Sequence, residues 1–335
     1  MLREDPLDGL AAEARAKLVA AAMPSWVEPM LATLTEERFS DPAWIFERKL
    51  DGERCLAFRS GGDVRLLSRN RKPLNDHYPE VADALARQRG HDLVLDGEVV
   101  ALVHGETSFS RLEHRIEVAD PRRARQSGIS VTYFIFDVVH LDGFDLTALP
   151  LRDRKAVLRG SVAFGGPVRY TPHRNAEGEA YYRHACRHGW EGVIAKLADG
   201  PYVHRRSTNW LKFKCQQGQE LVVGGFTDPR RSRRGFGALL VGYYRGEELV
   251  YAGKVGSGFD AQTLAELRAR MDALAEPRPP FAGTGLPRDA HWVRPELVCE
   301  VRFSEWTPDG RLRHPTFLGL REDKDAREVV REEPV

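Results

Sequence analysis

The segment from Glu47 to Arg54, ERKLDGER, places a lysine at the end of an apolar stretch and follows it at once with Asp51-Gly52. The amine of Lys49 is a nucleophile only when it is uncharged, so its pKa must fall through burial or nearby cations. A cleft between strands would provide both burial and nearby cations. A surface lysine beside a turn has the same short pattern, so KLDG alone does not separate the two interpretations.

Further short segments with charged or aromatic residues follow KLDG in one order. They are SRN at 68–70, DGE at 96–98, FIFDVVHLDG at 134–143, EGVIAK at 191–196, WLKFK at 210–214 and RHPTFLGLREDK at 313–324. Glu98 and Glu191 are carboxylates, which Mg²⁺ prefers as ligands. Lys212 and Lys214 are two apart on an expected strand, so they point the same way and can face phosphates. Together the segments indicate nucleotidyl transfer to a lysine.

In this order the segments resemble the motifs of the covalent nucleotidyltransferases, the superfamily of DNA ligases, RNA ligases and mRNA capping enzymes. KLDG resembles motif I, which implies that Lys49 is the catalytic nucleophile and attacks the α-phosphate of ATP. The resemblance further implies that Arg54 lies near the ribose or the 3' phosphate end. It also makes Glu47 and Leu50 candidates for contact with the nucleotide.

The middle segments also resemble motifs of this superfamily. SRN resembles an element that places Arg69 near the nucleotide or the 5' phosphate of a nick, and DGE resembles one whose acidic residue, here Glu98, contacts ribose or metal. FIFD resembles motif III, whose aromatic residue packs on adenine. Phe136 is the choice for that role because it immediately precedes Asp137, and Phe134 is the alternative.

The later segments resemble motifs IV, V and VI. They imply that Glu191 holds a metal, that Ile194 contacts the nucleotide, and that Lys212 and Lys214 face the phosphates. The two ammonium groups should also lower the pKa of Lys49. In RHPTFLGLREDK, Arg321 and Lys324 match residues that orient the departing pyrophosphate, and the spelling is close to that of bacterial end-joining ligases.

The resemblance implies an ATP-dependent DNA ligase that seals 3'-hydroxyl/5'-phosphate nicks in duplex DNA through a lysyl-AMP, using ATP with Mg²⁺ or Mn²⁺. Nicked duplex DNA and an end-bridging Ku protein are the expected partners of a monomer in the cytoplasm. An RNA ligase or mRNA guanylyltransferase is the alternative, but capping enzymes usually carry threonine where this chain has Leu50. A non-catalytic nucleic-acid binder with the same fold would form no covalent adduct with ATP.

The length of 335 residues predicts two domains. The expected class is α+β: a nucleotidyltransferase domain (ATP-grasp-like adenylation) with antiparallel sheets and flanking helices at 1–217, then an OB-fold β-barrel at 218–335. Strands are expected within 43–68 and from 92, 131 and 193, and short strands after 220. Helices are expected at 10–23, 78–88, 109–118, 176–188 and 261–274.

Composition limits the remaining possibilities. With 50 basic and 49 acidic residues, a DNA-binding surface must come from local clusters such as 121–125, 204–206 and 230–234. The four cysteines lie far apart and show no paired short spacing, which predicts reduced thiols and argues against a zinc ribbon. No apolar run approaches the length of a membrane span.

Overall fold

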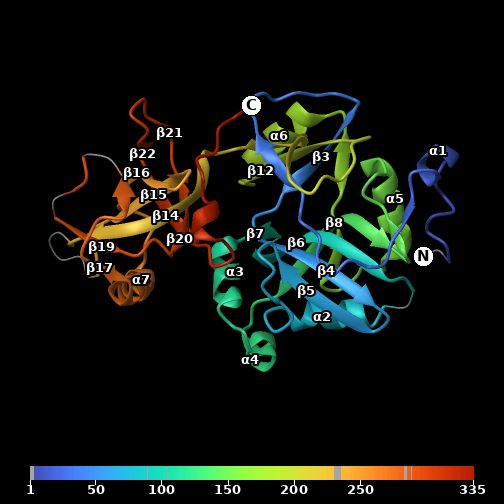
Figure 1. Ribbon diagram of the computed structural model, residues 1–335, viewed down its shortest axis with the longest axis horizontal. Coiled ribbons are helices and arrows are strands. Elements are labelled where there is room, and N and C mark those ends of the chain that lie inside the picture. Colours follow the sequence, from blue (N-terminus) through green and yellow to red (C-terminus); the bar gives the residue numbers. More distant parts are fainter. Residues whose placement is uncertain (1–3, 89, 104, 230–234, 283–284, 288) are drawn as a thin grey trace. The chain divides into compact units, whose positions relative to one another are not determined.

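The computed structural model describes residues 4–335 apart from 89, 104, 230–234, 283–284 and 288. The chain forms two compact units (Figure 1). The first comprises Met1–Cys215 with Glu333–Val335, and the second comprises Gln216–Glu332. The basic run at 230–234 lies outside the described residues. Each unit is described here by itself.

Sheet A of the first unit is mainly antiparallel. Its strand order is β1 (Val19–Ala20), β9 (Phe144–Asp145), β8 (Val131–Leu141), β6 (Leu93–Val103), β4 (Glu53–Ser60) and β5 (Asp63–Ser68). β10 (Val168–Tyr170) adds to β8 in parallel, and β7 (Glu106–Thr107) pairs with β6. The turn between β4 and β5 is at Gly61, whose φ of 57° favours glycine, as the Gly61-Gly62 pair predicts.

Sheet B is smaller and carries most of the candidate site. Its order is β11 (His173–Asn175), β3 (Trp44–Lys49), β12 (Gly192–Leu197), β13 (Arg206–Lys214) and β2 (Leu31–Leu34). β2 runs parallel to β13, and the other neighbours are antiparallel. β3 and β13 therefore flank β12 and bring segments far apart in sequence side by side.

Helices cover the outer faces of both sheets. α2 (Pro79–Ala86), α3 (Phe109–Ile116) and α5 (Leu151–Ser161) pack on sheet A, and α6 (Gly178–Arg187) packs on sheet B. Between the sheets lies a separate apolar cluster that includes Leu56, Phe136 and Trp210. The basic run at 121–125 begins α4 (Pro121–Gln126).

The predicted helices at 78–88, 109–118 and 176–188 are confirmed as α2, α3 and α6. The predicted helix at 10–23 is wrong, because only α1 (Ala12–Arg15) is helical and Val19–Ala20 forms strand β1. α5 was not predicted. Among the described residues, no helix is both long and apolar enough to cross a membrane.

The second unit is an OB-fold barrel, and the α+β class is confirmed. One path runs β17 (Ala275–Glu276), β19 (Ala290–Val293), β14 (Gly218–Thr227), β15 (Leu239–Arg245), β16 (Glu248–Val255) and β18 (Phe281–Ala282). β20 (Val298–Arg302) joins β14 to β23 (Thr316–Leu320), and β21 (Glu305–Trp306) pairs with β22 (Leu312–Arg313). α7 (Ala261–Ala273) confirms the helix predicted at 261–274, and a short 3-10 turn covers Ala326–Glu328.

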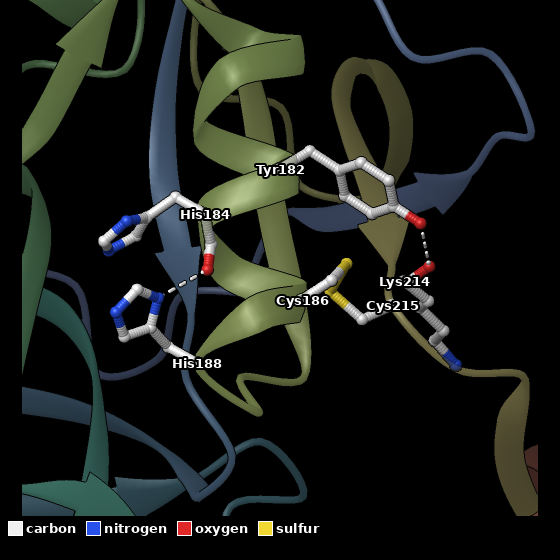
Figure 2. The surroundings of a disulfide bond; sticks show 6 residues. All are labelled: Tyr182, His184, Cys186, His188, Lys214 and Cys215. Atoms are coloured by element: carbon white, nitrogen blue, oxygen red, sulfur yellow. Dashed lines mark hydrogen bonds between the residues drawn. A yellow bond between two sulfur atoms is a disulfide. The ribbon is translucent and has the colours of Figure 1, made fainter.

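The prediction of four reduced thiols is wrong. Cys186, near the end of α6, forms a disulfide with Cys215, which follows β13 (Figure 2). Their Cα atoms lie 5.2 Å apart although 29 residues separate them in sequence, so only the packing of α6 on sheet B reveals the pair. Cys55 and Cys299 are free and buried.

Candidate active site

The register of β3, β12 and β13 lines up the motif residues in rows across sheet B. Residues directly opposite one another on neighbouring strands share a face of the sheet. Residues two apart on a strand share it as well. The three rows on this face are Lys49, Gly192 and Lys214; Glu47, Ile194 and Lys212; and Ile45, Lys196 and Trp210.

The other face of the same strands is core. Phe46, Val193 and Phe213 pack against Tyr181 and Ala185 of α6. Side chains alternate between the two faces of a strand. One set therefore packs sheet B against α6, and the other set faces away from this helix, where it can take part in chemistry.

Lys49 lies at the end of β3 and forms an ion pair with Glu191, the residue before β12. Burial lowers the pKa of Lys49, and so does Lys214, but the Glu191 carboxylate outweighs both and the pKa is raised. The prediction of a lowered pKa for Lys49 is therefore wrong. That prediction counted the two lysines of β13 and overlooked the carboxylate that the register brings to the amine.

Gly192 lies between Lys49 and Lys214 in their row. Its φ is 154°, and a Cβ atom there would lie 2.0 Å from the carbonyl oxygen of Phe213. No other residue fits without moving β13, because a clash of that size with backbone cannot be relieved by a side-chain rotation. The glycine leaves the space between the two lysines free of a side chain.

Sheet A contributes Arg54 and Glu98, which are partners in the register of β4 and β6, and Glu98 in turn pairs with Phe134. Phe136 lies where the register between β6 and β8 shifts, so the bulge turns it out of the regular alternation. Its ring meets Trp210 edge to face at 5.9 Å. Phe136 thus connects the two sheets.

Arg54 is held by Asp96, the first residue of the DGE segment, to which no role was assigned. Both oxygens of Asp96 accept from its guanidinium group, at 2.5 and 2.6 Å, and the hydroxyl of Tyr202 donates to Asp96 at 2.7 Å. Burial opposes the charge on Arg54, but Asp96 outweighs it and raises the pKa of Arg54. The guanidinium carbon lies 4.7 Å from the centre of the Phe136 ring. Asp96 precedes the predicted Glu98 by two residues, whereas Tyr202 carried no sequence signal.

Glu47 is also bound in a way the sequence did not indicate. Its two carboxylate oxygens contact the ammonium groups of Lys155 at 2.5 Å and Lys196 at 2.7 Å. Burial raises the pKa of Glu47, but the two lysines outweigh it and the pKa is lowered. Burial lowers the pKa of Lys196 to about 8. The Lys196 ammonium lies 4.1 Å from the ring centre of Phe136, so this group borders the aromatic cluster.

The remaining predicted residues lie elsewhere. Leu50 follows β3 and Arg69 follows β5, both partly buried. Arg321 and Lys324 belong to the second unit, where Arg321 pairs with Asp323 at 2.9 Å and Lys324 pairs with Glu220 at 3.1 Å. They are therefore not brought to Lys49 within one unit.

A divalent metal was predicted on Glu98 and Glu191. Within the part of the chain that the structure describes, no three His, Cys, Asp or Glu side chains gather as a metal cluster. Mg²⁺ is usually held by one or two carboxylates together with substrate phosphates and water. Glu98 and Glu191 are two carboxylates of the kind that Mg²⁺ takes as ligands alongside phosphate oxygens and water.

The sequence of the chain matches two regions of a known protein family. Residues 29–214 match the family described as ATP dependent DNA ligase domain, and residues 232–324 match the ATP dependent DNA ligase C terminal region. The chain is 39% identical over 321 residues to the multifunctional non-homologous end joining protein LigD of Pseudomonas aeruginosa, covering 93% of this chain and 37% of the relative. It is 33% identical to DNA ligase C1 of Mycolicibacterium smegmatis, covering 89% of this chain and 91% of the relative.

A solved structure titled mycobacterial DNA ligase D complexed with ATP and MES is similar at 35% identity and a TM-score of 0.64. The match covers 91% of this chain and 98% of that one. The chain spans 37% to 40% of the length of the LigD relatives from Pseudomonas aeruginosa and Mycobacterium tuberculosis.

Proposed function

Because the chain belongs to the ATP-dependent DNA ligase family, we propose that it seals nicks in duplex DNA through an AMP carried covalently on Lys49. We propose the first unit as the adenylation domain and the second as the OB domain that assists it. The RNA ligase and guanylyltransferase alternatives are not favoured, since both matched family regions are those of DNA ligases.

The observation that carries the proposal is the row of Lys49, Gly192 and Lys214 with Glu191 beside it. A nucleophilic amine, a second ammonium group and a carboxylate meet at one end of one sheet face. Phosphoryl transfer needs little covalent chemistry from a protein beyond the nucleophile, and depends on positioning and on neutralising charge. This end of sheet B supplies both.

Three transfers account for the reaction. Lys49 forms a bond to the α-phosphorus of ATP as the bond to pyrophosphate breaks, and its amine loses a proton. The AMP then passes from Lys49 to the 5' phosphate of the nick. The 3' hydroxyl attacks that phosphate, loses its proton and expels AMP. We assign to Lys212 and Lys214 the neutralisation of phosphate charge, and to Arg321 and Lys324 of the second unit the orientation of the pyrophosphate.

We propose that the base binds beside the apolar cluster that lies between the two sheets. Ile194 lies in the row beside Glu47, and Phe136 would supply an aromatic face for the base. We assign to Arg54, whose guanidinium lies over the Phe136 ring, and to Leu50 contacts with the nucleotide. Glu47 is two residues before Lys49 on the same face of β3. Its ionised carboxylate can only accept hydrogen bonds, so we propose that it faces an amino group of the base.

We propose that Glu98 and Glu191 hold a Mg²⁺ or Mn²⁺ ion that enters with ATP. Bound there, the ion would neutralise phosphate charge as the P–O bond to pyrophosphate breaks. We propose that Arg69 contacts the nucleotide or the 5' phosphate of the nick.

The test is the covalent intermediate. Incubation with ATP and Mg²⁺ should add one AMP to the intact protein, and peptide mass spectrometry should find it on Lys49. Lys49→Ala should abolish the adduct but retain part of the sealing activity on a nick that already carries AMP, because only the first transfer needs the amine. An adduct on another residue, or none in the wild-type protein, would refute the proposal.

The cellular role is a further proposal. The relatives named for non-homologous end joining support a role in joining broken DNA ends, with an end-bridging Ku protein as the partner. The substrates, ATP and DNA, support action in the cytoplasm, and one nucleotide site per chain is compatible with a monomer. Sealing of nicked plasmid with and without Ku would test the partnership.

A further inference from the structure

Lys155 is a buried charged residue to which no motif and none of the three transfers assigns a role. It projects from α5 and its ammonium group contacts one oxygen of Glu47 at 2.5 Å. The side chains of Lys155 and Glu47 are 3% and 2% exposed. Lys155 also donates to the carbonyl oxygen of Thr171 at 3.3 Å, which fixes the end of its long side chain.

The other Glu47 oxygen contacts Lys196, so the carboxylate is held from both sides. Lys196 comes from β12 within sheet B, whereas Lys155 comes from a helix that packs on sheet A. Removing one of two partners from a buried charge leaves an ion that is short of compensation and can reorient toward the remaining partner. Lys155 therefore decides whether Glu47 keeps its direction or swings toward Lys196.

We propose that Lys155 is a positioning residue: acting through Glu47, it holds the carboxylate in the orientation that accepts a hydrogen bond from the amino group of the base. This inference rests on the proposed function, because it takes ATP as the ligand. Lys155 itself does not touch the nucleotide. It sets how strongly the site prefers a base with an amino group over one without.

The experiment compares two nucleotides in formation of the covalent intermediate. ATP carries the amino group, and purine riboside 5'-triphosphate has a hydrogen in its place. Lys155→Met should raise the half-saturating ATP concentration by roughly 10-fold or more, the effect of losing one hydrogen bond to a charged group, and change the maximal rate much less. The preference for ATP over the analogue should fall by a similar factor.

A matched control comes from the same helix. Arg159 lies over the same ring as Lys155, that of Tyr170, at 4.4 Å against 4.7 Å. Arg159 is exposed, whereas Lys155 is buried against Glu47. Arg159→Met should therefore leave the nucleotide preference as in the wild type. Lys155→Arg keeps the positive charge and should recover much of the preference, and it serves as the second variant if Lys155→Met does not fold.

A double-mutant cycle tests whether Lys155 acts through Glu47. In a Glu47→Gln background, Lys155→Met should have little further effect on the nucleotide preference. If Lys155→Met weakens both nucleotides equally, or if its effect is unchanged in the Glu47→Gln background, the positioning role is refuted and Lys155 is structural. A wild-type protein that forms no adduct with ATP would instead refute the proposed function, so the two failures are distinguishable.

Discussion

The Lys49 ammonium is in direct contact with the Glu191 carboxylate, across the end of β3 and the start of β12. An amine in such a pair is protonated and cannot attack phosphorus. The pair must therefore open, or the proton must leave, before the first transfer. The contact with Glu191 thus holds the Lys49 amine in place and raises its pKa.

Glu191→Ala should slow formation of the covalent intermediate by roughly 100-fold, since a group positioned in the reaction centre is lost. Quench-flow or gel assays with α-labelled ATP would measure it. Glu177→Ala is a suitable control, because Glu177 is an exposed carboxylate just before α6. Equal rates for the wild type and Glu191→Ala would remove Glu191 from the reaction centre.

Asp96→Asn should destabilise the first unit by about 3–5 kcal/mol, the usual cost of leaving one charge of a buried pair without its partner. Asp96 is fully buried, and its side chain pairs with the guanidinium of Arg54. Tyr202→Phe removes the hydroxyl that donates to Asp96 and accepts from the backbone N–H of Met30, and should cost about 1.5–3 kcal/mol. Urea unfolding followed by fluorescence would rank the two variants, and similar losses for both would show that the Arg54–Asp96 pair is not what stabilises this region.

The Cys186–Cys215 disulfide ties the end of α6 to the residue after Lys214, where the first unit ends. Tyr182 of α6 also donates to the carbonyl oxygen of Lys214 at 3.2 Å (Figure 2). Replacing both cysteines by alanine should lower the free energy of unfolding by about 2–4 kcal/mol, because the unfolded chain regains freedom. Alkylation of unfolded, unreduced protein should modify only Cys55 and Cys299. Labelling of all four would show that the bond is absent.

The sequence predicted the longer strands of the two sheets and three helices of the first unit, because their apolar positions follow the strand or helix period. It did not predict the short strands such as β1, β2 and β11. It missed α5 for a physical reason. Arg154 and Lys155 are fully or almost fully buried on the core side of that helix, where the periodic pattern requires apolar residues. Each is paired with a carboxylate, Asp137 or Glu47, that only the fold brings close.

The sequence predicted residues of the candidate site but not the contacts between them. Motif order identified Lys49, Lys212 and Lys214, and alternation on two strands accounts for their common face. It could not predict the Glu191 contact or the Arg54–Asp96 pair, since both depend on register between strands that are distant in sequence. The raised pKa of Lys49 is a direct result of that register.

His173 should make stability depend on pH. It is opposite Glu47 in the register of β11 and β3, and burial, with help from Lys155, lowers its pKa to about 4. The unfolded chain takes up this proton near the ordinary pKa of about 6.5, well before the folded protein does. Between those values the unfolded state binds more protons, so the free energy of unfolding falls as the pH drops from about 6.5 toward about 4.

His173→Gln should flatten this part of the pH dependence, which urea titrations at several pH values between 7 and 4 would measure. Carboxylates also titrate near the lower end, so the comparison must be with the wild type at each pH and not with an absolute slope. His114→Gln changes an exposed histidine on α3 and should leave the slope unaltered. If His173→Gln and His114→Gln give the same slope as the wild type, then His173 is not buried as a neutral group beside the Lys155–Glu47 pair.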